Sequence, residues 1–400
     1  MKAVTRRGFV QSAGAAAGAG LLAPFSSASA VAWSPCGADV SADTVAGATA
    51  DLDRSVRLGG DGIAISPRAY ATLLDELCRQ ADVAEDNYLL GGEVERFEQH
   101  WAGLLGKERA VFMPSGTLAN QLALRALAGD KRRVVVPEMS HIYNDTGDAC
   151  QTLSNLTLLP LAAGVATFTR ADVEAVVTRT AGGRVATEVG ALAVESPIRR
   201  LFGQMFDWEE AKRVTAFARE RGIGTHLDGA RLFIASAYTV ITPRQYAAEF
   251  DTVYVSLWKY FNSGIGSILA GPKRLLDDMF HARRMFGGNL AVGWPAALIA
   301  RHFMEGFEQR FKSAVTVSEA FYTQMARHPR VTIERIPNGT NITRMTIKGA
   351  DPAILRTRLR EKNIFLPAPA SDGVFMPTVN ETWNRTTAAN LAAAFDEAIG

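Results

Sequence analysis

The sequence predicts an α/β fold with two parts, a large domain on a mostly parallel sheet and a smaller α+β domain after it. Three observations support this prediction. From about residue 109 onward, short apolar runs of strand length alternate with helical patterns. The helical patterns are bounded by capping residues. Past Pro295 the alternation gives way to a long helical stretch and a shorter set of strands.

The predicted strands are continuous apolar runs, a pattern typical of strands that are buried on both faces of a sheet. They cover residues 110–113, 134–136, 191–194, 224–227, 253–257 and 267–270. In sheets of this kind the ligand site lies at the carboxyl ends of the strands. We therefore expect the residues that carry chemistry just after these runs.

Helices are predicted between the strands. Asp207 is expected to cap a helix over 208–221, and Thr117 to cap one over 118–128. A glycine follows each helix, where a C-terminal cap belongs. These signals complete the alternation of strand and helix.

The chain is expected to divide into four parts, which are a signal peptide (1–30), a linker (31–56), the large domain (57–295) and the small domain (296–400). The small domain is predicted to contain a long helix (297–328), strands (331–333 and 342–347) and a last helix (388–399).

The first thirty residues have the layout of an export signal. A basic start, an apolar stretch rich in Ala and Gly, and a small-residue end at 28–30 follow one another. Arg6 and Arg7, with Phe9 after them, are similar to the twin-arginine signal of bacteria. We expect a periplasmic or otherwise exported protein, and a cytoplasmic one if the signal is not used. The alternative is a tail in which two arginines occur by chance.

Composition argues against several classes of partner. The formal net charge is only +2, and Lys and Arg are scattered among Asp and Glu. Such a distribution favours neither a nucleic acid nor, once the signal is removed, a membrane surface as partner. Cys36, Cys78 and Cys150 have no C-x-x-C spacing, and the histidines are not clustered, so we expect no metal site or disulfide framework.

The first candidate site follows the run 110–113. There, Ser115, Gly116 and Thr117 form a glycine turn between two hydroxyls at the start of a helix. Free backbone N–H groups and the positive end of the helix dipole suit such a turn to a phosphate. An ordinary helix cap is the simpler interpretation of this segment when it is taken alone.

Two further candidates follow the next strands. His141 stands where its ring can stack over a planar ligand, although a lone loop histidine is more commonly a polar surface residue. Asp228 follows the run 224–227, where a carboxylate can pair with a protonated ring nitrogen. Arg231 can bind a carboxylate or a phosphate through two parallel hydrogen bonds. A structural Asp–Arg pair is the alternative.

Lys259 follows the run 253–257 between Trp258 and Tyr260. Partial removal from water lowers the pKa of a lysine and leaves a neutral amine that can form an imine. A structural lysine with its head in water is the alternative. The order of phosphate turn, stacking histidine, aspartate and lysine, each after its own strand, favours the functional interpretation.

This succession resembles the fold-type-I enzymes that use pyridoxal 5′-phosphate (PLP), and in particular the threonine aldolase and β-eliminating lyase family. The resemblance extends from about Asp61 to Gly288. Its most specific segments are 86–88, 112–120, 226–233, the strand before Lys259, and 283–288. The resemblance implies a PLP-transferase-like large domain and a small C-terminal domain.

The resemblance also implies roles for individual residues. Lys259 would bind PLP covalently, Asp228 would pair with its ring nitrogen and His141 would stack on the ring, and these three are the expected catalytic residues. The expected cofactor-binding residues are Ser115, Gly116, Thr117, His141, Asp228, Arg231 and Lys259. The expected substrate-binding residues are Arg231, Tyr88 and Arg199. Family members are dimers or tetramers, so a homo-oligomer is implied in which Arg283 or Arg284 serves the neighbouring site.

The sequence departs from the family pattern at positions that hold the substrate. The segment 195–199 lacks the histidine associated with the β-hydroxyl, and 59–62 lacks a serine. The second arginine for the substrate carboxylate would fall near Phe375. Arg199 or Arg200 is expected to replace part of this lost anion binding.

The expected function is therefore that of a PLP-dependent lyase acting on an amino acid. The reaction is cleavage of a β-hydroxy-α-amino acid into glycine and an aldehyde, or β-elimination. A PLP-dependent aminotransferase and a PLP-binding protein without turnover are the alternatives.

Overall fold

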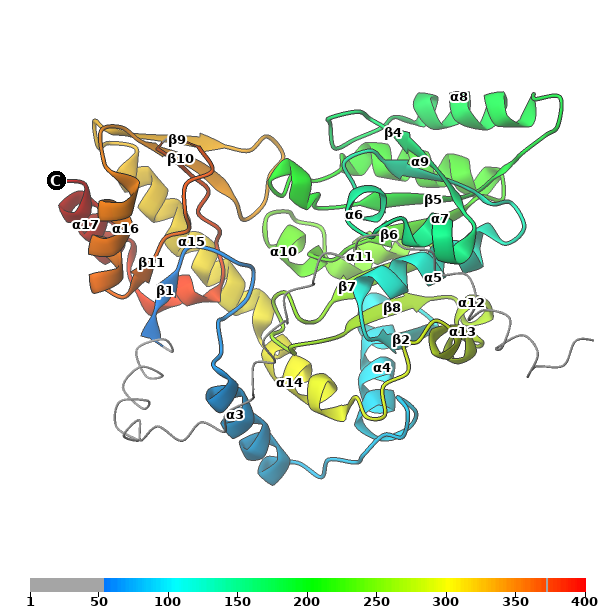
Figure 1. Cartoon of the computed structure of the whole chain (residues 1–400), viewed down its shortest axis with the longest axis horizontal. Helices are drawn as coiled ribbons and strands as arrows, with labels where there is room; N and C mark the ends of the chain where they lie inside the picture. The colour runs from blue at the N-terminus through cyan, green and yellow to red at the C-terminus, as the bar shows by residue number, and fades with distance from the viewer. Residues whose placement is uncertain (1–53, 372) are drawn as a thin grey trace, which may run out of the picture. The chain divides into compact units, whose positions relative to one another are not determined.

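The computed structural model describes residues 54–371 and 373–400 (Figure 1). The predicted signal peptide, most of the predicted linker and Cys36 lie outside these residues, so the expectations about them stay predictions. Cys78 and Cys150 are free thiols. Among the described residues, no helix has both the length and the apolar character needed to cross a membrane.

A seven-stranded sheet has the strand order β2-β8-β7-β6-β5-β3-β4. Its strands are β2 (Arg109–Met113), β3 (Arg133–Pro137), β4 (Thr157–Leu161), β5 (Val189–Glu195), β6 (Gly224–Asp228), β7 (Thr252–Ser256) and β8 (Ser267–Gly271). The strands from β7 to β4 pair in parallel, whereas β8 is antiparallel to both of its neighbours. This mostly parallel sheet confirms the predicted fold class.

Helices cover both faces of the sheet. On one face, α5 (Gly116–Ala128) packs against β5, β6, β7 and β8. On the other, α4 (Gly92–Leu105) packs against β2 and β8, and α9 (Trp208–Glu220) against β6. Consecutive strand residues therefore enter different cores, as Val111 packs with α5 and Phe112 with α4. Burial on both faces explains the continuous apolar runs.

The predicted strands all form, but one strand of the seven-stranded sheet was missed. β4 has the sequence Thr-Leu-Leu-Pro-Leu and is the last strand of the sheet. An edge strand tolerates proline, because one row of its backbone groups has no partner strand. Because β4 contains a proline and partly exposed residues, its sequence is not a continuous apolar run, and the sequence pattern did not predict it.

Two helix predictions need correction. The helix predicted to follow Thr117 begins at Gly116 and is capped by Ser115, whose hydroxyl accepts the N–H of Leu118. The helix predicted over 297–328 is two helices, α14 (Trp294–Met304) and α15 (Phe307–Met325). Between them Gly306 has φ +68°, a left-handed conformation that glycine adopts without strain and that ends the helical path.

A second group of elements, most of which follow α15 in the chain, completes the fold. It contains the antiparallel sheet β12-β10-β9 and the parallel pair β1–β11. The elements are β1 (Val56–Arg57), β9 (Val331–Arg335), β10 (Thr343–Ile347), α16 (Pro352–Glu361), β11 (Ile364–Phe365), β12 (Val374–Phe375) and α17 (Ala388–Ile399). In Figure 1 the blue strand β1 lies beside β11, so the first described residues pack with the last part of the chain. The predicted domain boundaries stay predictions.

The other helices are short connections or outer layers. They are α3 (Pro67–Gln80), α6 (His141–Asn144), α7 (Ala149–Ser154), α8 (Arg170–Ala181), η1 (Arg199–Leu201), α10 (Leu232–Ala237), α11 (Pro243–Ala248), α12 (Lys273–Leu276), α13 (Met279–Met285) and η2 (Glu381–Arg385).

Candidate active site

The candidate residues lie just after the carboxyl ends of parallel strands. The turn 115–117 follows β2, His141 follows β3, Asp228 ends β6 and Lys259 follows β7. Strand β5 lies between β3 and β6 and ends at Glu195. Because these strand ends share one edge of the sheet, segments that are far apart in sequence converge there.

Lys259 is a partly buried amine among charged groups. Its Nζ lies 4.8 Å from the centroid of the Trp258 ring. Burial lowers the pKa of Lys259 to about 8, and the positive charge of Arg231 acts in the same direction. Asp228 and Asp61 oppose the shift. A sizeable fraction of the amine is therefore neutral near pH 8 and able to act as a nucleophile.

Asp228 is a buried carboxylate held by two hydrogen-bond donors. The Asn120 amide donates to its Oδ2 at 2.7 Å, and the N–H of Ala230 donates to its Oδ1 at 3.2 Å. Each carboxylate oxygen can accept more than one hydrogen bond, so capacity for a further donor remains. Asp228 can therefore receive a protonated ring nitrogen.

The turn at the start of α5 is shaped by Gly116. A Cβ atom at this position would lie 2.1 Å from the Tyr254 hydroxyl, so a larger residue does not fit. Ser115 is exposed at the helix start. The first N–H groups of a helix have no intrahelical partner, and with the helix dipole they favour an anion.

Arg231 is oriented by Asp61, which sequence reasoning had not assigned a role. Its Nε donates to Asp61 Oδ2 at 2.8 Å, and Asp61 Oδ1 lies 3.8 Å from Nη1 of Arg199. Burial alone would raise the pKa of Asp61, but the two arginines and the Asn341 amide lower it below its usual value. One carboxylate thus holds two guanidinium groups.

The segment that carries Asp61 also packs against residues 259–262, the loop that contains Lys259. A Cβ atom at Gly62 would lie 2.4 Å from Asn262 Oδ1 and 2.5 Å from the carbonyl oxygen of Lys259. The Asn262 side chain accepts the N–H of Ile63 at 2.9 Å. Asp61, Arg231 and Lys259 therefore belong to one site.

His141 begins α6 and is joined to β5 through Glu195. Its backbone N–H donates to Glu195 Oε2 at 2.6 Å, and its Nδ1 lies 3.5 Å from the Asp145 carboxylate. The N–H of Arg199 donates to the other oxygen of Glu195 at 3.4 Å. Glu195 thereby connects the segment that begins at His141 with the turn that begins at Arg199.

The family model for β-eliminating lyases matches residues 71–348, which include His141, Asp228 and Lys259. The chain belongs to the β-eliminating lyase family.

Similar proteins agree with this membership and with the fold of the lyase. The low specificity L-threonine aldolase of Saccharomyces cerevisiae is 26% identical over 298 residues, which are 73% of this chain and 75% of the yeast protein. A solved structure from Listeria monocytogenes, assigned as an L-allo-threonine aldolase, has a TM-score of 0.72 at 27% identity and covers 87% of this chain and 97% of its own. One from Exiguobacterium, assigned as an aromatic amino acid β-eliminating lyase/threonine aldolase, has a TM-score of 0.71 at 25% identity and covers 88% and 98%. The predicted family and fold type are confirmed.

Other predicted residues of the lyase lie in different surroundings. Tyr88 is exposed, and the Arg284 guanidinium lies 5.5 Å from the centroid of its ring. Phe375 is buried in the hydrophobic core formed by β1, β9–β12 and the helices α15–α17. Its position therefore offers no cationic side chain to a substrate carboxylate. Arg283 or Arg284 was expected to serve a neighbouring site, but Arg283 is buried and donates to the carbonyl oxygen of Phe112. That expectation is wrong for Arg283, because its side chain faces the interior of its own subunit.

The structure also brings in lyase residues to which sequence reasoning gave no role. Asp61 and Glu195 connect the loops of the site, and Asn120 and His226 lie behind Asp228. One signal was available for His226. It lies two residues before Asp228 on a strand, so both side chains point to the same face of the sheet.

Proposed function

We propose that this lyase uses PLP to cleave the Cα–Cβ bond of a β-hydroxy-α-amino acid, giving glycine and an aldehyde. The observation that carries the proposal is that a Lys259 amine of lowered pKa and the buried carboxylate of Asp228, which accepts two hydrogen bonds, lie at the same edge of the sheet. The threonine aldolases among its relatives support the substrate class. β-Elimination from a β-substituted amino acid is the second reaction that such a site can perform.

The residues present fit PLP. Lys259 would attach its aldehyde carbon, Asp228 would pair with its ring nitrogen and His141 would stack on its ring. The turn at Ser115, Gly116 and Thr117 would hold its phosphate, since Tyr254 leaves space for no side chain at the glycine. When bound, PLP supplies an electron sink for bonds at the substrate Cα.

The protein's own groups would orient the substrate and move protons. Arg231, fixed by Asp61, presents a guanidinium that can bind the substrate carboxylate. Arg199 shares the same aspartate and can replace part of the anion binding that is missing at Phe375. Lys259 or His141 accepts the β-hydroxyl proton, and Cα is protonated after the bond breaks.

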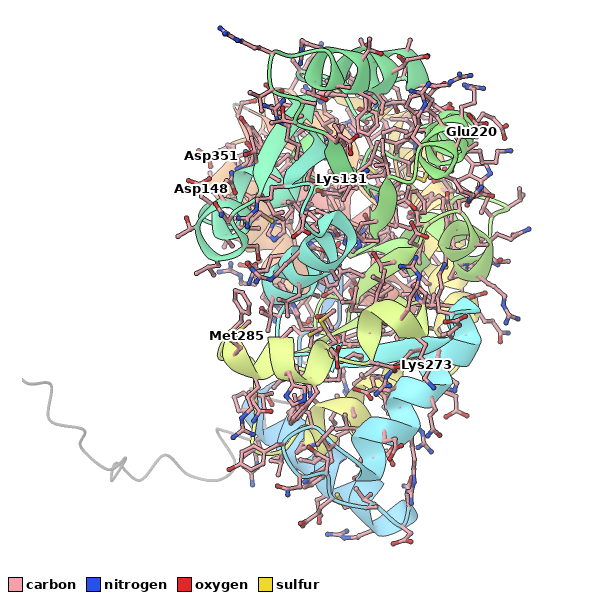
Figure 2. The ribbon with its side chains drawn as sticks, turned by 90° about the vertical axis from the view of Figure 1, so that its right-hand side faces the viewer. Lys131, Asp148, Glu220, Lys273, Met285 and Asp351 are labelled. Carbon is pink, nitrogen blue, oxygen red and sulfur yellow. The ribbon has the colours of Figure 1, made fainter. Side chains whose placement is uncertain are left out.

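We further propose that the lyase is a homodimer or homotetramer. Four exposed apolar side chains, Tyr88, Leu90, Met285 and Val292, come from two neighbouring segments, which are joined by a hydrogen bond from the N–H of Tyr88 to the carbonyl oxygen of Ala291. Figure 2 shows Met285, 69% exposed, on the outside of α13. Exposed apolar side chains of this kind favour a protein partner. An oligomer contact here would place Tyr88 and Arg284 where a neighbouring site could use them.

We also propose export through the twin-arginine route, on the basis of the sequence of residues 1–30 alone. Replacement of both arginines by lysine should then keep a tagged protein in the bacterial cytoplasm. Periplasmic accumulation of the double-lysine protein would contradict this proposal.

The proposed reaction can be tested with purified mature protein supplied with PLP. Candidate substrates are L-threonine, L-allo-threonine, phenylserine and β-substituted alanines. Glycine together with an aldehyde supports carbon–carbon cleavage, and ammonia together with a keto acid supports β-elimination. Lys259→Ala should lose both the visible absorbance of the lysine-bound cofactor and product formation. If that absorbance persisted in Lys259→Ala, the cofactor assignment would be wrong.

A further inference from the structure

A chain of three hydrogen bonds lies behind Asp228. The Asn120 amide donates to Asp228 Oδ2 at 2.7 Å. Its Oδ1 is 2.9 Å from Nε2 of His226, and Nδ1 of His226 is 2.8 Å from the hydroxyl of Thr252. The chain thus runs from Thr252 through His226 and Asn120 to the carboxylate.

The four side chains come from three different elements and are closed off from water. Asn120 lies on α5, His226 and Asp228 on β6, and Thr252 on β7. Each residue is at most 1% exposed. Polar groups at this depth cannot exchange their partners for solvent, so every hydrogen bond lost here leaves an unsatisfied group.

The direction of every hydrogen bond in the chain follows from its carboxylate end. An ionised carboxylate only accepts, so the Asn120 NH₂ group faces Asp228 and its carbonyl oxygen faces His226. The histidine must then donate from Nε2, which leaves Nδ1 as the acceptor of the Thr252 hydroxyl proton. Burial lowers the pKa of His226 to about 3, although a hydrogen bond with the backbone of Thr252 opposes the shift, so the ring is neutral at physiological pH.

We infer that Thr252, His226 and Asn120 are positioning residues, which direct hydrogen-bond donation onto Asp228 and stabilise the negative charge that pairs with the cofactor ring nitrogen. This inference rests on the proposed function, since it needs PLP in the site. Reversal of the chain would turn the carbonyl oxygen of Asn120 toward the carboxylate. Two acceptors would then face each other, and the pairing of Asp228 with the ring nitrogen would weaken.

Asn120→Asp is the most direct test, because it keeps the shape and replaces the NH₂ donor by a second carboxyl group, which competes with Asp228 for one proton. We expect the dissociation constant for PLP to rise about tenfold or more, which is the loss expected for a hydrogen bond to a charged group. The pH at which the visible absorbance of the lysine-bound cofactor changes should shift as well. Thr252→Val should change both in the same direction but less, and it provides a test if Asn120→Asp does not fold.

The matched control is Thr215→Val. Thr215 is also fully buried, but it lies on α9 and its hydroxyl donates to the carbonyl oxygen of Lys212. Removing this hydroxyl should leave both the affinity for PLP and the absorbance profile unchanged.

The tautomer of His226 gives a readout that does not depend on activity. Nitrogen-15 NMR of histidine-labelled protein, assigned with His226→Gln, should show a proton on Nε2 and no titration between pH 5 and 9. A proton on Nδ1, or the same affinity for PLP in Asn120→Asp as in Thr215→Val, would overturn the inference while leaving the proposed function intact. Wild-type protein that takes up no PLP would overturn the proposed function, and this role with it.

Discussion

Glu195, the last residue of β5, is the register partner of Asp228, the last residue of β6, so two buried carboxyl groups end adjacent strands. Burial raises the pKa of Glu195 to about 8, and the negative charge of Asp228 adds to the shift. Glu195 therefore keeps its proton to a higher pH than an exposed glutamate does. The same side chain accepts the backbone N–H groups of His141 and Arg199.

The raised pKa of Glu195 predicts that stability falls as pH rises. Between about pH 4.5 and 8 the unfolded chain releases this proton and the folded chain keeps it, so the free energy of unfolding decreases with pH. The slope is at most about 1.4 kcal/mol per pH unit. Glu195→Gln should remove this component, because glutamine stays neutral and can still accept the N–H of His141. Urea unfolding of both proteins at pH 5 and pH 8 measures the difference. An identical pH dependence would refute the prediction.

The lowered pKa of Lys259 predicts how cofactor attachment depends on pH. The attacking amine must be neutral, so the rate of PLP attachment should rise up to about pH 8 and then level off. An ordinary lysine would continue to gain reactivity up to about pH 10. Stopped-flow absorbance after mixing cofactor-free protein with PLP measures this rate. Continued acceleration above pH 9 would contradict the lowered pKa.

The two neighbouring arginines after β5 should differ in their effects on catalysis. Arg199 faces Asp61 in the site, whereas Arg200 pairs with Asp145 through Nε at 3.0 Å. Arg199→Ala should raise the apparent KM about tenfold with little change in kcat, because it removes binding shared by ground state and transition state. Arg200→Ala should have a smaller effect on KM. Steady-state kinetics measures KM and kcat of both variants. Arg335→Ala is the control, because Arg335 is a half-exposed arginine that pairs with Glu319. If neither Arg199→Ala nor Arg200→Ala raises KM, substrate anion binding by this turn is excluded.

Arg283 should contribute to stability rather than directly to catalysis. It donates to the carbonyl oxygen of Phe112, and Glu98 accepts the N–H of the same residue at 2.7 Å. Burial raises the pKa of Glu98 to about 7, and Arg283 opposes this shift. Arg283→Met should lower the free energy of unfolding by about 1–3 kcal/mol, since it leaves the buried carbonyl oxygen of Phe112 without its donor and removes the positive charge that opposes the pKa shift of Glu98.

Urea denaturation measures this loss, and the double variant Arg283→Met/Glu98→Gln should recover part of it. In the double variant, Glu98 no longer carries a charge that lacks the nearby positive charge of Arg283. A double variant that is no more stable than Arg283→Met would show that the two side chains act independently.

The central sheet was predictable because burial on both faces forces its strands to be apolar runs. The strand ends that carry Asp228 and Lys259 could be found for the same reason, since a polar residue directly after such a run is conspicuous. β4 was not predicted, because a strand at the edge of the sheet does not need a continuous run of apolar residues. The break between α14 and α15 at Gly306 was not predicted, because the sequence pattern is helical on both sides of it.

The sequence by itself determined the fold type and the family, and it predicted the residues that would hold PLP, because all of these depend on short motifs at strand ends. Only the tertiary structure decided which groups control those residues. Asp61 lies 170 positions from Arg231 and Asn120 lies 108 positions from Asp228, yet each pair shares a hydrogen bond. No local periodicity records such contacts, since they are produced by packing a helix and an N-terminal segment against the carboxyl edge of the sheet. The inward direction of Arg283 is likewise a tertiary contact, since α13 places its guanidinium against the carbonyl oxygen of Phe112 on β2.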